Sequence, residues 1–177
     1  MSKNLFLLPA LLGAFLLFAT ACGDSCDTTK CGFGTCLDGT CECDLGYEKD
    51  SDGNCTIASR DKFLGNYTVN ETCSNSGTAT PYPVGIIAGT AVNEVKMNGV
   101  YGPVATGGFV NSVIAKIEGN TITIDRQQPD NDKFYITGSG TINTTSSPVK
   151  ITVQYTVTNE NPSPIVTNTC NEVIFTK

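Results

Sequence analysis

Apolar and polar residues alternate along much of the chain beyond residue 60, and this alternation predicts β-strands. Between residues 149 and 158 the apolar side chains share one face: Val149, Ile151, Val153, Tyr155 and Val157. Lysine, threonine and glutamine occupy the positions between them. Strict alternation is typical of a strand that buries one face and exposes the other. Ile122 and Ile124 alternate with threonines in the same way.

Turn signals separate eight such segments. Strands are expected at residues 64–73, 82–88, 91–97, 112–117, 121–125, 133–141, 149–158 and 166–175. Asn98-Gly99 and Gly119-Asn120 are among the turn signals between them. We found no segment with helical periodicity longer than two turns. Short strands joined by short turns predict a mainly β fold, an antiparallel meander that curls into a closed barrel; a two-layer β-sandwich is the alternative.

The N-terminal segment, residues 1–21, has the organisation of an export signal. Lys3 is the only charged residue before Asp24, and residues 5–18 are apolar apart from one proline and one glycine. Such a stretch is too short and too interrupted to remain in a bilayer as a spanning helix. We therefore expect a signal peptide that is removed from the mature chain.

The residues that follow indicate a lipid anchor. Ala19-Thr20-Ala21 before Cys22 resembles the lipobox of bacterial lipoproteins, although leucine is commoner at the position of Ala19. The resemblance implies cleavage before Cys22 and acylation of its thiol and its new amine, with residues 22–25 as the tether. Several acyl chains on one residue anchor a protein firmly. The alternative is an ordinary secretory signal in which Cys22 is incidental.

The cysteine count supports the lipid anchor. The chain has nine cysteines, and an odd count in an exported protein needs an explanation. If Cys22 carries lipid, the other eight can all pair in an oxidising compartment. Six of them lie within residues 26–55, a segment too small to bury a stabilising core without crosslinks. We place a linker at residues 56–61 and a second domain at residues 62–177.

The cysteine-rich segment contains the run CGFGTCLDGTCECDLGY. Six cysteines alone leave the pairing open. The Cys-x-Cys-x2-Gly-Tyr core resembles an epidermal growth factor-like (EGF-like) module, although the loop between the third and fourth cysteines is short. Asp38-Gly39 in that loop is a tight-turn signal. The resemblance implies the disulfides Cys26–Cys36, Cys31–Cys41 and Cys43–Cys55.

Cys73 and Cys170 are the two cysteines left, and they lie in the first and last expected strands of the second domain. A disulfide needs Cα atoms about 5.5 Å apart, which is the spacing of neighbouring strands. If the two cysteines pair, the sheet closes and loses its exposed edges. A closed meander that begins with the run FLGNY, residues 63–67, resembles lipocalin-type barrels, although the tryptophan usual in that family is absent.

Neither catalysis nor a metal site is expected. The chain has no histidine, no Gly-x-Ser-x-Gly elbow and no phosphate-binding loop. The carboxylates of Asp125, Asp130 and Asp132 surround an expected turn and are read as solvated. Zinc is disfavoured by the cysteine spacing. Residues 48–53, with acids at every second position and a glycine at the end, resemble the start of a calcium loop. Ser59 occupies the position of its distal glutamate, and a solvated turn is the alternative. We expect no metal, no cofactor and no enzymatic activity.

Binding remains as the expected activity. A small eight-stranded barrel can hold one apolar ligand, whereas side chains can equally fill its interior. Candidate ligand-lining residues are Tyr67, Val69, Phe109, Ile122, Ile124, Phe134, Ile136, Val153 and Tyr155. The alternative is a structural or assembly lipoprotein with a solid core and a sheet surface that docks a partner.

The expected partners are a membrane, through the lipid on Cys22, and an unknown small apolar ligand or protein. The net charge of −6 and the lack of a basic run argue against nucleic acid. The expected location is the outer membrane of a Gram-negative bacterium, with the chain displayed at the surface. A hydrolase is the least supported function.

Overall fold

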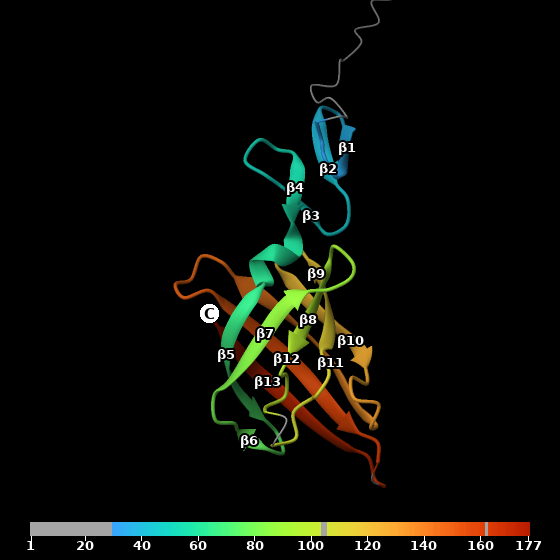
Figure 1. Ribbon diagram of the computed structural model, residues 1–177, viewed down its shortest axis with the longest axis vertical. Helices are drawn as coiled ribbons and strands as arrows, with labels where there is room; N and C mark the ends of the chain where they lie inside the picture. Colours follow the sequence, from blue (N-terminus) through green and yellow to red (C-terminus); the bar gives the residue numbers. More distant parts are fainter. Residues whose placement is uncertain (1–29, 104–105, 162) are drawn as a thin grey trace, which may run out of the picture.

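The computed structural model describes residues 30–103, 106–161 and 163–177 of the chain. A small disulfide-rich module lies above a β-barrel in Figure 1. The expected signal peptide, tether and lipid attachment at Cys22 lie outside the described residues, as does Cys26. In the part of the chain that is described, no helix has the length and apolar character needed to cross a membrane.

The small module consists of two short hairpins. β1 (Gly34–Leu37) pairs with β2 (Thr40–Cys43), and β3 (Tyr47–Lys49) pairs with β4 (Cys55–Ala58). Asp38 and Gly39 connect the first pair with positive φ angles of 48° and 78°, as a tight hairpin turn requires. The ring of Tyr47 stacks on that of Phe33 with centroids 4.2 Å apart.

The expected disulfides Cys31–Cys41 and Cys43–Cys55 are present in this module. Cys36 is also disulfide-bonded, but its expected partner Cys26 lies outside the described residues. The four cysteines at positions 31, 36, 41 and 55 form the buried centre of the module. Crosslinks therefore take the place of an apolar core, as the short segment requires.

The junction between module and barrel differs from the expected linker at residues 56–61. β4 continues to Ala58, and the 3-10 helix η1 (Ser59–Phe63) follows at once. The Phe63 side chain is fully buried in the barrel core. Lys62 Nζ pairs with Glu48 Oε1 of the module at 2.5 Å. This segment has a structural role that polarity and turn signals did not reveal, because it closes one end of the barrel.

The second region is the expected closed, eight-stranded antiparallel barrel, and the sandwich alternative is wrong. Its strands are β5 (Gly65–Cys73), β7 (Tyr82–Ala88), β8 (Glu94–Asn98), β9 (Val113–Glu118), β10 (Thr121–Gln127), β11 (Phe134–Asn143), β12 (Lys150–Asn159) and β13 (Val166–Thr176). Each strand pairs with the next, and β13 pairs with β5 to close the ring. The short β6 (Gly77–Thr78) adds to the end of β5. The Cys73–Cys170 disulfide joins the two closing strands.

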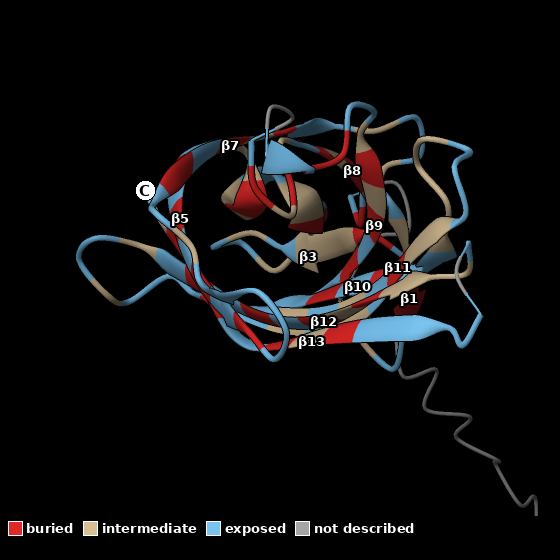
Figure 2. Ribbon diagram, turned by 90° about the horizontal axis from the view of Figure 1, so that it is seen from below, coloured by how far each residue is buried: buried red, intermediate tan, exposed pale blue. Residues whose placement is uncertain are grey.

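Inward side chains of all eight strands meet in one core. Figure 2 views the barrel from below, with buried segments recurring along the strands and a helical turn across the barrel. On β11 two glycines, Gly138 and Gly140, occupy inward positions between Ile136 and Ile142. A Cβ atom at Gly138 would lie 2.4 Å from the Gln154 carbonyl oxygen, so glycine permits the close approach of β12.

Candidate functional site at the barrel mouth

The two ends of the barrel differ, and the end opposite η1 is the candidate site. We call this end the mouth; it is the lower end in Figure 1. The connections of residues 74–81 and 99–112 lie at the mouth together with the nearby ends of β11, β12 and β13. We call residues 99–112 the mouth loop, of which residues 104 and 105 are outside the described part.

A carboxylate is buried beneath the mouth. Strand β5 alternates strictly, so that Glu71 projects inward between Val69 and Cys73 and is only 5 % exposed. Its carboxylate accepts a hydrogen bond from the Tyr155 hydroxyl of β12. Tyr82 of β7 lies within hydrogen-bonding reach of the same carboxylate and of the Tyr155 hydroxyl. Three strands thus place a carboxylate and two phenols together inside the barrel.

The two phenols are held in their protonated form. Burial raises the pKa of the Tyr155 hydroxyl well above its ordinary value, and the neighbouring Tyr82 and Glu71 raise it further. Burial also raises the pKa of Tyr82, with added contributions from the charge and hydrogen bond of Glu71. Desolvation disfavours the charged phenolate, and a nearby carboxylate repels it. Both tyrosines are therefore hydrogen-bond donors across the physiological pH range.

Tyr101 of the mouth loop covers this group. Its ring meets that of Tyr155 edge-on, with centroids 6.2 Å apart, and lies 6.0 Å from that of Phe109. Its backbone has a positive φ of 67°. Bulky residues avoid this region, and holding one there costs about 1–3 kcal/mol, which the surrounding structure must offset. Such strained positions cluster at ligand sites.

Asn168 of β13 holds Tyr101 in place. Its Nδ2 donates to the Tyr101 hydroxyl at 2.8 Å and to Ser76 Oγ at 3.0 Å. Its Oδ1 accepts from the Asn75 N–H at 2.8 Å and from Ser74 Oγ at 3.2 Å. Because these bonds use both donors and both acceptor positions, Asn168 positions the mouth and has no free capacity for a ligand.

Further contacts fix the mouth loop. The Gly102 N–H hydrogen-bonds to the Tyr82 hydroxyl. The carboxylate of Asp130 accepts the N–H groups of Val110 and Asn111 at 2.8 and 2.7 Å. The loop also folds back on itself, since a Cβ atom at Gly108 would lie 1.7 Å from the Gly102 carbonyl oxygen. Only glycine allows this approach.

Two cavities open at the mouth, on either side of Tyr101. The larger, of 330 Å³, is lined by Glu71, Ser76, Ala79, Thr80, Pro81, Tyr101, Gly102, Pro103 and Thr106. The smaller, of 240 Å³, is lined by Asn75, Ser76, Tyr101, Phe134, Val157, Asn159, Val166 and Asn168. Both combine apolar walls with a few polar groups, which is the usual composition of small-molecule sites.

The expected ligand-lining residues belong to the barrel core. Eight of the nine are 0–3 % exposed: Tyr67, Val69, Phe109, Ile122, Ile124, Ile136, Val153 and Tyr155. A cavity between them would leave their side chains accessible to water. The ninth, Phe134, packs against the core and lines the smaller mouth cavity. The space for a ligand is therefore at the mouth rather than among these side chains.

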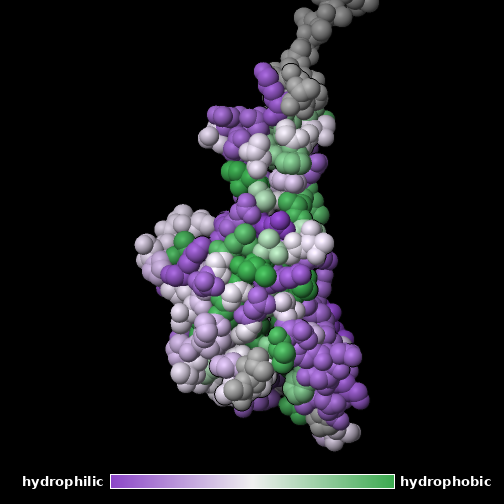
Figure 3. Space-filling model, viewed as in Figure 1, coloured by the Kyte–Doolittle hydropathy of each residue, from purple (hydrophilic) through white to green (hydrophobic). Residues whose placement is uncertain are grey.

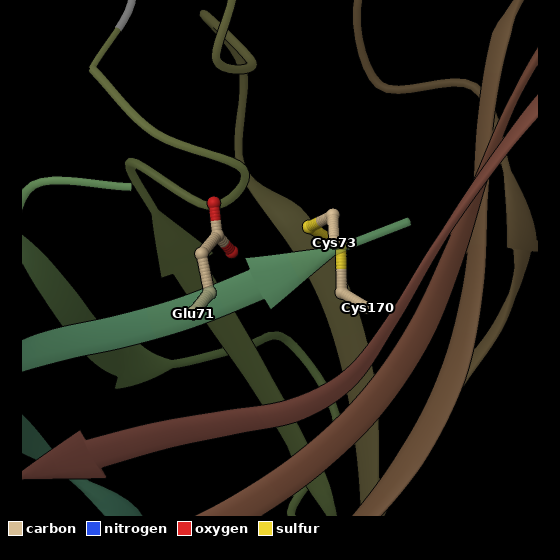
Figure 4. A group of neighbouring side chains, drawn as sticks. All are labelled: Glu71, Cys73 and Cys170. Carbon is tan, nitrogen blue, oxygen red and sulfur yellow. A yellow bond between two sulfur atoms is a disulfide. The ribbon is translucent and has the colours of Figure 1, made fainter. Parts of the chain in front are cut away.

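The Cys73–Cys170 disulfide lies beside the buried carboxylate. An oxygen of Glu71 and the two sulfurs lie within 4.8 Å of one another, and Figure 4 shows Glu71 and Cys73 on the same strand. A metal would need thiolate ligands, but these sulfurs are bonded to each other. This group therefore does not form a metal site while the disulfide is intact.

The other carboxylates noted in the sequence have local structural roles. Asp50 Oδ1 accepts the N–H groups of Asp52 and Asn54 at 2.9 Å each, and Oδ2 accepts the Thr56 hydroxyl at 2.7 Å. These bonds, above all the one from Thr56, lower the pKa of the Asp50 carboxyl. The residues that resemble the start of a calcium loop thus form a turn that Asp50 organises. Asp125 pairs with Lys116 at the surface.

The outer face of β10–β13 carries a shallow, polar hollow of 460 Å³. Its lining is rich in hydroxyl and amide groups: Thr123, Thr137, Ser139, Gln154, Thr156, Thr169 and Asn171. Hydrophobic surface occurs as separate spots on the face shown in Figure 3, and the lower right of that face is mostly hydrophilic. A broad apolar docking face is not visible from this side.

Comparison of the chain with protein-family profiles, with curated proteins and with solved structures found no match in any of the three. The candidate site therefore rests on its own geometry. Sequence reasoning missed Glu71, although extending the inward alternation of Tyr67 and Val69 by one step would have placed a charge inside the barrel. It also missed Tyr82, Tyr101 and Asn168, which come together only when the barrel closes.

Proposed function

We propose that this chain is an exported, lipid-anchored binding protein that takes its ligand at the barrel mouth. The observation that carries the proposal is the buried Glu71 carboxylate, which borders a 330 Å³ cavity beneath Tyr101. A group that costs free energy to bury persists where function uses it. The packed interior below provides a rigid support for the site.

Binding is better supported than catalysis. The chain has no histidine, so the commonest general base is missing. The cysteines at the mouth are joined in a disulfide and are not nucleophiles. Among the described residues that line the larger mouth cavity, Glu71 is the one carboxylate, so the cavity lacks the pair of carboxylates that glycoside hydrolysis uses.

A structural protein that docks a partner on its sheet is the second candidate. The hollow on β10–β13 favours it, because threonine and amide side chains line an open surface there. The two candidates differ in where binding fails on mutation. Substitutions at the mouth affect the first, and substitutions of outward threonines affect the second.

Native mass spectrometry of the protein purified from its own host tests the mouth. We expect a bound small molecule on the wild type and its loss from Tyr101→Ala. Tyr135→Ala is the matched control, since the Tyr135 ring lies outside the barrel, where Arg126 Cζ is 3.7 Å from the ring centroid. Equal occupancy in both variants would place the ligand elsewhere, and no bound molecule in any sample would favour partner docking.

The anchor is tested separately by feeding cells radiolabelled palmitate. The wild type should incorporate label, and Cys22→Ala should not. Equal labelling of the two would remove the lipid anchor from the proposal. The binding site at the mouth would be unaffected by that result.

A further inference from the structure

Glu71 has no cationic partner among the residues that the structure describes. The ion pairs among the described residues are Lys62–Glu48, Lys116–Asp125 and Arg126–Glu160. All three are exposed or partly exposed, and none lies in the barrel interior. Every lysine and arginine except Lys3 is within the described part of the chain. Among the described residues, Glu71 is the one buried acid of the barrel, and its carboxylate is held by hydrogen bonds alone.

Those hydrogen bonds leave capacity on the carboxylate. An ionised carboxylate accepts about four hydrogen bonds on its two oxygens. Tyr155 and Tyr82 supply donors to it, and neither carries a charge. A buried carboxylate without a counter-charge is costly, and a cation with N–H donors would offset that cost. The larger mouth cavity offers an approach to Glu71, which lines it.

The residues that line this cavity indicate what the rest of the ligand is like. Ala79, Pro81, Pro103 and the Tyr101 ring provide apolar contacts, and Thr80 and Thr106 add hydroxyl groups. A volume of 330 Å³ accommodates a small molecule but not a long acyl chain. The net charge of −6 attracts cations over distance and disfavours anions.

We propose that the larger mouth cavity binds an alkylammonium group, with its N–H donors on the Glu71 carboxylate and a short apolar body against Tyr101 and Pro103. This inference rests on the proposed binding function and specifies its ligand class. The ammonium completes the charge pair that the fold leaves open. An alcohol of the same shape lacks the charge and binds less well.

The probe is phenethylamine, titrated calorimetrically into the purified protein, with 2-phenylethanol and 3-phenylpropionate as neutral and anionic counterparts. Backbone NMR shifts of Tyr101 and Gly102 report whether binding occurs at the mouth. Glu71→Gln keeps the side-chain shape and removes the charge. Glu172→Gln is the matched control, because Glu172 is exposed on the adjoining strand β13, where its neighbour Val173 pairs with Glu71.

We expect phenethylamine to bind the wild type and Glu172→Gln equally, and Glu71→Gln at least tenfold more weakly. On the unmodified protein, 2-phenylethanol should bind at least tenfold more weakly than phenethylamine, and 3-phenylpropionate should not bind. This ligand comparison needs no variant, so it holds even if Glu71→Gln does not fold. A second arm uses Nα-acetyl-lysine methylamide, and tighter binding of this compound than of phenethylamine would identify the source as a lysine side chain.

Equal binding of amine and alcohol at the mouth would overturn the ammonium inference and leave the mouth as a ligand site. Amine binding that shifts only residues away from Tyr101 and Gly102 would overturn it too. The absence of binding by every probe would also overturn it. In that case the native mass spectrometry of Tyr101→Ala still decides the proposed function by itself.

Discussion

The closed end and the mouth of the barrel are built from the same eight strands but bury opposite kinds of groups. At the closed end, Phe63 of η1 enters the core, and its carbonyl oxygen accepts the Tyr67 hydroxyl at 2.9 Å. At the mouth, Glu71, Tyr82 and Tyr155 share a buried hydrogen-bond network. One end is closed by an aromatic side chain, whereas the other contains a buried carboxylate and is bordered by cavities.

The two ends of the barrel therefore have different roles: the closed end stabilises the fold, and the mouth is the candidate binding site. Apolar burial stabilises a fold without directional requirements, so the closed end needs only a side chain of suitable size. A buried polar network requires every member in place and is costly when one is missing. The buried network of Glu71, Tyr82 and Tyr155 lies at the end with the cavities, away from η1, whose Phe63 plugs the closed end.

The largest effect is expected at the closed end. Phe63→Ala should lower the free energy of unfolding by about 3–5 kcal/mol, because it removes a fully buried aromatic side chain and leaves a void. Urea unfolding followed by circular dichroism measures this change. Phe33→Ala, in the exposed part of the module, is the control and should cost much less. A loss below about 1 kcal/mol for Phe63→Ala would mean that η1 is not a plug.

The disulfide at the mouth should come next. Cys73→Ala/Cys170→Ala should cost about 2–5 kcal/mol, since the bond closes a loop with a sequence separation of 97 and joins the strands that complete the ring. It should also increase aggregation by freeing two strand edges. Cys43→Ala/Cys55→Ala, in the module, is the matched control. If the control destabilises the barrel more, the module rather than the closing pair holds the barrel together.

The buried phenols predict a loss of stability at high pH. In the unfolded chain tyrosines ionise near pH 10, whereas burial keeps Tyr82 and Tyr155 protonated in the folded chain. Their contribution is complete below about pH 10 and is lost as pH rises above it, because only the unfolded state releases the protons. Each should contribute a slope of about 1.4 kcal/mol per pH unit there.

Thermal melts between pH 8 and pH 11 measure this slope. Tyr82→Phe/Tyr155→Phe should flatten it, because phenylalanine has no proton to release. If the double variant has the same slope as the wild type, the loss of stability at high pH arises from other groups. The buried phenols would then not distinguish the mouth from the closed end.

The smallest effect on stability is expected in the mouth loop. Gly108→Ala forces the loop away from the Gly102 carbonyl, which a Cβ atom would overlap. We expect a cost of about 1 kcal/mol, with clear NMR shifts at Tyr101 and little change around Phe63. Gly107→Ala is the control for space alone, since nothing lies within 4 Å of a Cβ there, although its φ of 99° adds strain. Uniform shifts through the barrel would show that the two ends are coupled.

The strands and the closure of the barrel were predictable because both follow from local patterns. Alternation in residues 149–158 identified β12, and the positions of Cys73 and Cys170 predicted which strands meet. The plug η1 was not predictable, because a single turn of 3-10 helix has no periodic signal. Nor was Gly138, whose role depends on how closely β12 approaches.

Most of the mouth could not be predicted from the sequence, for a different reason. Glu71, Tyr82 and Tyr155 lie on three strands, and Asn168 on a fourth, so their contact requires the closed ring. The positive φ of Tyr101 has no signal in the sequence, since Gly102-Pro103 predicts only a turn. The residues chosen as ligand-lining candidates were chosen for being apolar, which selects the core and passes over a carboxylate.

The placement of the small module also determines how a ligand would meet this protein. The described chain begins at Lys30 in the module, and the module adjoins the closed end of the barrel, so the mouth is at the far end from the N-terminal side. A chain held at Cys22 would therefore present its opening to the surrounding water. Ligand would arrive by three-dimensional diffusion from the bulk phase rather than by lateral partition through the bilayer, and the capture rate would follow its dissolved concentration.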